Sequence, residues 1–153
     1  MGDTVIFSNA LIAVGTGTAS ADRVLSGRAR NITWTEEFED HDVTVFGSTN
    51  RVRAVGLGES NLDIELMQSY ASADSEENID SLLNTLRDLS ATGKKFLVRF
   101  RPVNAARNAT NPEYSMLAIM TKRNIVDGEV AAPLMNPITL LSAGDITRAT
   151  ATT

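Results

Sequence analysis

The chain has no cysteine and only one histidine, His41, among its 153 residues. The lack of cysteine excludes disulfides, thiolate metal sites, iron–sulfur clusters and thiol nucleophiles. A Ser/His/Asp triad or a zinc site could be built only around His41, and transition-metal sites usually draw on more than one His or Cys. Aromatic residues make up 5% of the chain, which disfavours a carbohydrate-binding module because such platforms use exposed Trp and Tyr.

Long hydrophobic runs are also missing. No stretch of 18 apolar residues occurs, and the N-terminus lacks the basic flank and apolar block of a signal peptide. We therefore expect a soluble protein that is not exported by the usual routes. At 42% hydrophobic residues the chain can form one compact domain. We expect an N-terminal arm, or a first strand and loop, at 1–28 and a single β domain at 29–153.

Charge is unevenly distributed along the chain. The net charge of −5 disfavours a protein that binds nucleic acid through its phosphates, so we expect no sequence-specific nucleic-acid binding. Residues 36–80 contain 12 acids and two bases, whereas residues 87–123 contain eight bases and two acids. This asymmetry would let one face of a copy attract a different face of the next. The residues that we expect at such contacts are Glu37, Glu39, Asp40, Asp42, Arg51, Arg53, Arg99 and Arg101.

Most of the chain has the period of two that is typical of β-strands. Ile32 and Trp34 alternate with threonines, and the stretch at 61–70 places Leu62, Ile64 and Leu66 on one face. Acidic and amide side chains on the opposite face indicate half-buried, antiparallel pairing. We therefore predict a mainly β fold, an antiparallel β-sandwich or half-open barrel of about seven or eight strands.

The alternation changes phase between Trp34 and Val43, because Ile32, Trp34 and Phe38 are even-numbered whereas Val43 and Val45 are odd-numbered. One unbroken strand cannot bury both sets, since each side chain changes face at every step. We therefore predict that the chain turns within residues 39–42. We also predict that the glycines at 56–58 interrupt the next strand.

A single amphipathic helix is predicted at about residues 75–90. Leucines recur at spacings of three and four, Asp74 and Glu77 suit a capping box, and Gly93 suits the C-terminal stop. We expect its apolar face to lie on the sheet.

The C-terminal third has further strand signals. Phe96, Val98 and Phe100 alternate with basic residues, and the run at 114–122 is apolar on both faces, as in a central strand. An Asp-Gly turn follows at 127–128. Pro133 and Pro137 favour an edge strand or a bulge for the segment around them.

The acids around His41 could in principle form a metal or acid/base site. A metal needs about three ligands on rigid supports, and catalytic carboxylates need burial that separates their pKa values. The predicted turn provides neither, so we expect no catalytic residue, metal or cofactor. A charged turn that faces solvent or a neighbouring subunit is the interpretation we adopt.

Several segments, taken in order, resemble the tail-tube-like structural proteins of long-tailed bacteriophages: "DVTVFGSTNRVRAVGLGESNLDIEL", "NIDSLLNTLRDL", "TGKKFLVRFRP", "NPEYSM", "VDGEV" and "GDITRAT". The resemblance spans about residues 31–150. It implies a β-sandwich or half-open barrel with one helix, no active site, and hexameric rings that stack with an inner β-barrel wall.

The resemblance implies a non-enzymatic virion protein that assembles with itself and with other virion proteins in the host bacterial cytoplasm. We expect a tail-tube subunit. A capsid decoration or minor capsid protein is the alternative, and a host- or carbohydrate-binding module is a more remote one. We expect no membrane partner.

Overall fold

A computed structural model of the chain describes residues 10–19, 21, 23–68 and 79–151. Eight strands and one helix form within these residues, so the mainly β fold with a single helix is confirmed. The elements are β1 (Leu11–Val14), β2 (Arg23–Val24), β3 (Ala29–Asp42), β4 (Arg53–Met67), α1 (Ile79–Ala91), β5 (Phe96–Arg101), β6 (Glu113–Arg123), β7 (Met135–Ser142) and β8 (Thr147–Ala149).

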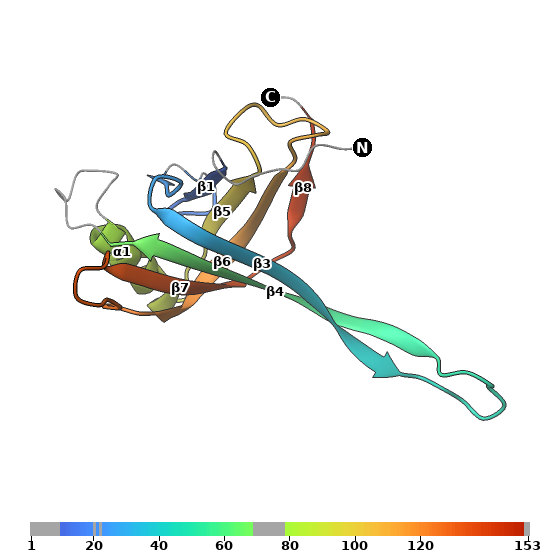
Figure 1. Ribbon diagram of the computed structural model, residues 1–153. Coiled ribbons are helices and arrows are strands. Elements are labelled where there is room, and N and C mark those ends of the chain that lie inside the picture. Colours follow the sequence, from blue (N-terminus) through green and yellow to red (C-terminus); the bar gives the residue numbers. More distant parts are fainter. Residues whose placement is uncertain (1–9, 20, 22, 69–78, 152–153) are drawn as a thin grey trace.

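The strands form one antiparallel sheet in the order β2-β1-β5-β6-β7-β4-β3, and β8 pairs with β6 beside β7. The described strands do not close into a barrel, because β2 and β3 lie at opposite ends of this order. Figure 1 shows α1 against one side of the sheet and the β3–β4 hairpin extending far beyond the rest of the molecule. The described part of the chain contains no helix long and apolar enough to cross a membrane.

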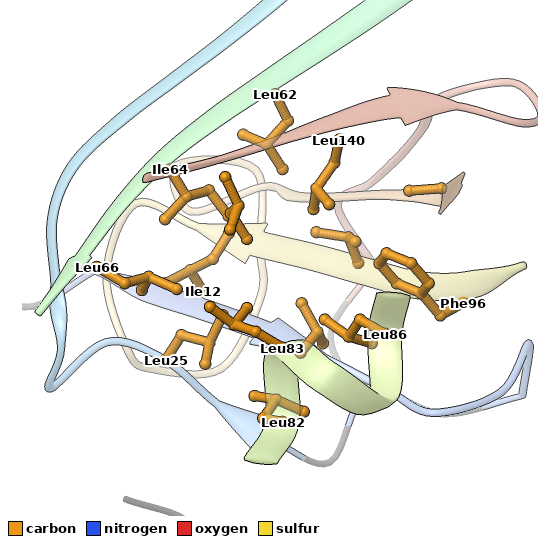
Figure 2. Close-up of a cluster of buried hydrophobic side chains, with 14 of the residues drawn as sticks. Ile12, Leu25, Leu62, Ile64, Leu66, Leu82, Leu83, Leu86, Phe96 and Leu140 are labelled. Carbon is orange, nitrogen blue, oxygen red and sulfur yellow. The ribbon is translucent and has the colours of Figure 1, made fainter. Parts of the chain in front are cut away.

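The core lies on one face of the sheet because apolar side chains alternate in register across it. Residues directly opposite one another in a ladder share a face, and Leu62 and Ile64 of β4 lie opposite Trp34 and Ile32 of β3. On the other side of β4, Leu62 lies opposite Leu140. Figure 2 shows Leu62, Ile64 and Leu140 gathered with side chains of β1, β5 and α1. The predicted inward faces of these strands are confirmed.

The helix covers one end of this apolar face. Ile79, Leu82, Leu83 and Leu86 are at most 1% exposed, as their spacing predicts. At the C-terminal end Gly93 has a φ of 76°, and the amide of Lys94 donates to the carbonyl of Leu89. This is a Schellman cap, so Gly93 ends the helix as predicted. The predicted capping box at Asp74 and Glu77 lies outside the described residues.

Two further contacts fix α1 to β6. The Ser90 hydroxyl accepts a hydrogen bond from the Met120 amide at 2.8 Å, and Arg123 donates to Asp80 at 2.9 Å. The strand β6 is central, with β5 on one side and β7 and β8 on the other, as its apolar faces predict.

The expectation that prolines confine the segment around 133–137 to an edge or a bulge is wrong. The strand β7 lies inside the sheet, between β6 and β4. Pro137 is tolerated because its carbonyl points toward the end of β6, where it accepts a bond from the Asn124 amide. In an antiparallel sheet the N–H and C=O of one residue point toward the same neighbouring strand. The nitrogen of Pro137 therefore also faces β6, at a position beyond the last β6–β7 pair, Arg123 with Ile138.

The predicted turn at 39–42 is also wrong. The strand β3 continues through these residues to Asp42 with its alternation unbroken, because the register shift between the pairs Phe38–Gly58 and Asp40–Val55 places the extra residue in β4. The change of parity is compatible with a bulge as well as with a turn, but the bulge observed is in β4 and leaves each β3 side chain on its original face. Phe38, Val43 and Val45, expected inside, are 57%, 47% and 69% exposed.

The glycines at 56–58 do not interrupt β4, which runs from Arg53 to Met67. They provide room for side chains of β3. A Cβ on Gly56 would lie 2.5 Å from Nε2 of His41, and one on Gly58 would lie 2.7 Å from Cε1 of Phe38. The hairpin turn falls instead in residues 43–52, where Gly47 has a φ of 94°.

The loop between β6 and β7 turns later than the Asp-Gly signal predicts. Asp127 is bridged to Met135, and the turn spans residues 129–132, with the Ala132 amide donating to the Glu129 carbonyl. Ala131 has a φ of 64°, so a residue other than glycine takes the left-handed conformation here.

We predict that Leu83→Ala lowers the free energy of unfolding by about 2–5 kcal/mol, because it leaves a cavity under the helix. Leu57→Ala is the matched control: Leu57 is 78% exposed, and its change should stay within about 0.5 kcal/mol. Urea titration followed by circular dichroism measures both. Equal effects of the two variants would contradict the core assigned here.

Candidate functional site

The β3–β4 hairpin is the most exposed part of the described chain. Every residue from Thr35 to Glu59 is exposed except Gly56, which is half-buried. Of the 12 exposed large hydrophobic side chains among the described residues, seven lie on this hairpin: Phe38, Val43, Val45, Phe46, Val52, Val55 and Leu57. Apolar side chains that gather on one projecting element are typical of an interaction surface, whereas single exposed apolar side chains are normal on any protein.

The predicted contact residues of the hairpin fall near one another. Asp40 forms an ion pair with Arg53, and Nε2 of His41 lies 3.4 Å from Glu39. All four side chains are half or more exposed. The Thr44 hydroxyl and amide both donate to Asp42, and these hydrogen bonds hold the pKa of Asp42 below its ordinary value. Asp42 is therefore a carboxylate at neutral pH.

Acidic residues line the β3–β4 side of the sheet, on the face opposite the core. Glu37 of β3 lies directly opposite Glu59 of β4, and Asp63 and Glu65 follow along β4 on the same face. Like charges opposite one another in a ladder are destabilising. A basic partner would relieve this repulsion.

Basic residues gather on the same face near the other side of the sheet. Arg99 and Arg101 of β5 and Arg107 of the following loop surround the carboxylate of Glu113, at 3.6, 3.4 and 2.9 Å. Three guanidinium groups around one carboxylate leave a local charge of +2. The Glu113 side chain is 11% exposed, whereas that of Arg99 is 34% exposed.

The two sides of the sheet therefore carry opposite charge. The acidic side also presents a free edge, because β3 pairs only with β4 among the described strands. A free edge offers a row of backbone N–H and C=O groups to another chain. One copy placed beside another in the same orientation would bring the acidic side of the first toward the basic side of the second.

A groove of about 810 Å³ opens on the core face, beyond the region that the helix covers. The Trp34 and Tyr114 rings meet edge to face in it, with centroids 6.5 Å apart. Further apolar lining comes from Ala10, Ile12, Ala29, Ile32, Phe100 and Ile146, and the exposed residues Arg30, Glu36 and Asn104 also line the groove.

The described residues contain no group of three His, Cys, Asp or Glu side chains that could hold a metal ion. His41 lies on the exposed hairpin, with Glu39 as its one acidic neighbour within ion-pair distance in the part of the chain that is described.

Sequence reasoning missed two features of this surface. Glu113 is one of only two acids in the basic stretch 87–123. Its position among so many bases is the sequence signal that could have identified it as the partner of the arginines. The groove has no sequence signal, because its lining comes from five separate parts of the chain.

No protein-family model matches the sequence, and no curated protein matches it either. Solved structures do match. A chain in the tail of an empty gene transfer agent particle with C6 symmetry matches with a TM-score of 0.63 and 15% identity, covering 91% of this chain and 94% of that one. The SPP1 tail tube matches with a TM-score of 0.65 and 12% identity, over 95% and 77%.

A chain of the sheath–tube complex of an extracellular contractile injection system, PVC, also matches, with a TM-score of 0.58 and 9% identity over 97% of this chain and 93% of that one. All three structures are of tails or tubes. At these identities the likeness shows a shared fold, and it extends over nearly the whole chain. The chain therefore has the fold of these tail and tube proteins, which is the fold that the sequence resemblance implied.

We predict that Glu113→Ala destabilises the protein by about 2–3 kcal/mol. The figure lies below the roughly 3–5 kcal/mol for breaking a buried ion pair, because the arginines are partly exposed. Glu129→Ala, at an exposed site in the β6–β7 loop, is the control and should change stability by less than about 0.5 kcal/mol. Thermal or urea unfolding of both variants is the measurement, and an unchanged Glu113→Ala midpoint would contradict the cluster.

Proposed function

We propose that this chain is the tube subunit of a phage-like tail, a non-enzymatic virion protein whose task is to assemble with itself. The supporting observation is the likeness of nearly the whole chain to proteins of tails and tubes. The structure of the gene transfer agent tail has C6 symmetry, and we propose rings of six for this chain as well. Its partners are further copies and other virion proteins, and it needs no cofactor.

The mechanism we propose for ring closure is side-by-side contact between copies. The free edge of β3 on one copy meets the β5 side of the next, and acidic residues approach basic ones. Glu37, on the free-edge strand, is the acid best placed for this contact. Arg99 is the best-placed base, since it is more exposed than Arg101 and lies at 3.6 Å from Glu113.

The remaining predicted contact residues lie at or near the end of the hairpin, and we propose that they contact a copy in a neighbouring ring. Arg51 lies in the turn and Arg53 begins β4, whereas Glu39, Asp40 and Asp42 precede the turn. Because Asp40 and Arg53 pair with each other within one copy, the contact with a neighbour falls mainly to the other residues.

The division into a segment at 1–28 and a domain at 29–153 remains a proposal. Within residues 10–28, β1 pairs with β5, and Leu25 lies in the core. We propose that β1 keeps this pairing within its own copy when the tube forms.

Capsid decoration is the weaker function. A decoration protein would bind to the surface of a capsid shell, whereas the matching structures reported above are of tails and tubes. A binding module for host carbohydrates has no supporting observation.

Electron microscopy of the purified protein at increasing concentration tests the proposed function. We expect rings with six-fold symmetry, and tubes formed by their stacking. Particles that remain monomeric at high concentration and bind only to purified capsids would instead support decoration.

We predict that the double variant Glu37→Lys/Glu39→Lys raises the concentration needed for assembly at least tenfold, because it reverses one charge at the side-by-side contact and one at the contact with a neighbouring ring. The matched control is Glu129→Lys, an exposed acid outside the proposed contact. Sedimentation measures the assembled fraction at low and at 0.5 M salt. Equal assembly of the double variant and the control would show that these acids do not face a neighbour.

A further inference from the structure

The β3–β4 hairpin leaves the sheet where β4 loses its pairing with β7. The last pair of that ladder on the hairpin side is Asn61 with Leu141. Beyond it, β3 and β4 continue as a two-stranded ribbon (Figure 1). The ladder between two strands does not by itself hold them at a fixed angle to the sheet that they leave. The direction of this hairpin therefore depends on the contacts at its root.

Ser60, which follows Asn61 toward the hairpin end, forms hydrogen bonds with both flanking strands. Its amide donates to the hydroxyl of Ser142, the last residue of β7, at 3.0 Å. This bond continues the contact between β4 and β7 by one step after the backbone pairing has ended. The Ser60 hydroxyl donates to the carbonyl oxygen of Thr35 in β3 at 3.2 Å, and it accepts from Nε1 of Trp34 at 2.7 Å.

The Ser60 side chain is buried, and its hydroxyl is used both as a donor and as an acceptor. Ser60 is 3% exposed, so little water is available to replace its bonds. Buried polar groups are nearly always hydrogen-bonded, and removal of one partner leaves the other unsatisfied at a cost in free energy. Ser60 therefore ties β3, β4 and β7 together at the root of the hairpin.

Trp34 connects this junction to the body of the molecule. It lies opposite Leu62 in the β3–β4 ladder, so Ser60 is its diagonal neighbour, within reach of a large aromatic side chain. The indole packs against the buried apolar cluster and meets the Tyr114 ring of β6 edge to face, with centroids 6.5 Å apart. A rotation of the hairpin about its root would therefore pull Ser60 away from an indole that the body holds in place.

We propose that Ser60, Trp34 and Ser142 form a rigid joint that sets the direction of the hairpin in the isolated copy. Ser60 is the positioning residue of this joint, because each of its three hydrogen bonds must break before the hairpin can turn relative to β7 and the core. A projection that is held in one direction before contact loses less conformational entropy when it binds, so any contact that it makes is stronger. The proposal concerns the isolated copy and does not depend on the proposed tube function.

Electron paramagnetic resonance between two spin labels tests the joint, because the chain has no cysteine that would interfere with labelling. The labels are attached through Val55→Cys in the hairpin and Lys95→Cys before β5, both at exposed positions. At concentrations too low for assembly, the labelled parent should give one narrow distance distribution. Ser60→Ala should at least double the width of this distribution. Ser142→Ala should broaden it less, because it removes one of the three bonds.

Ser115→Ala is the matched control, since Ser115 is a half-buried serine of β6 that lies outside the joint, and it should leave the width unchanged. Trp34 is the only tryptophan, so its fluorescence anisotropy gives a second readout. Ser60→Ala should lower this anisotropy, because the indole loses its hydrogen-bond acceptor. Circular dichroism and urea titration verify that each variant is folded under the conditions of the measurement.

A serine that only stabilises the fold would lower the urea midpoint when replaced and leave the native distance distribution narrow, and this result would overturn the proposal. If Ser60→Ala does not fold, Ser142→Ala decides: a broader distribution supports the joint, and an unchanged width overturns it. Electron microscopy of the parent protein tests the tube function separately. Absence of rings and tubes would overturn that function and leave the joint intact, whereas tubes from a chain with unchanged widths would overturn only the joint.

Discussion

Burial of Leu62, Ile64 and Leu66 fixes the register of β4, and the other parts of the sheet are positioned from that strand. These three side chains are at most 1% exposed and alternate with polar residues that face away from the core. A slip of one residue would bury Asp63 and Glu65 and expose the leucines, so the register is strongly specified. Through its two ladders, β4 sets where β7 lies on one side and where β3 lies on the other. The direction in which the hairpin leaves the body follows from the same register.

The molecule divides into a part that is stable by itself and a part that is completed by contact. The body buries an apolar cluster from both ends of the described chain, with α1 over one end of it. Within the described residues, no layer packs on either face of the hairpin beyond Glu36. Two-stranded ribbons of this kind are marginally stable in water. Its bulge, its opposed carboxylates Glu37 and Glu59, and its exposed apolar end are all unfavourable in an isolated copy. The assembly proposed above would offset these costs, because a neighbouring copy would supply basic and apolar surface.

Local patterns were enough to predict the elements that lie on the core, and they failed where a residue serves something other than its own core. Alternation identified the buried faces at Ile32, Leu62 and Phe96 correctly, and leucine spacing identified α1. The phase change after Trp34 was correctly seen but attributed to a turn, because the argument assumed that Val43 and Val45 must be buried. They are exposed on the projecting hairpin, and alternation alone does not reveal whether either face of a strand is buried. The prediction that Gly56 and Gly58 interrupt β4 failed for a related reason. These glycines make room for side chains of β3, and this role can be recognised only when the pairing of the two strands is known. The sequence predicted a concentration of basic residues, but only the fold shows that three arginines surround Glu113.

The seven paired positions between β4 and β7 also determine how the body resists a pull on its projection. A force applied at the hairpin end along the strands acts on the ladder from Asn61–Met67 to Met135–Leu141. The hydrogen bonds of an antiparallel ladder run perpendicular to the strands, so this load shears them together instead of opening them one at a time. A ladder loaded in shear resists extension far better than a ladder whose hydrogen bonds are pulled apart one at a time. A subunit built in this way transmits tension from its hairpin directly into the strand that carries Leu62, Ile64 and Leu66 of the core.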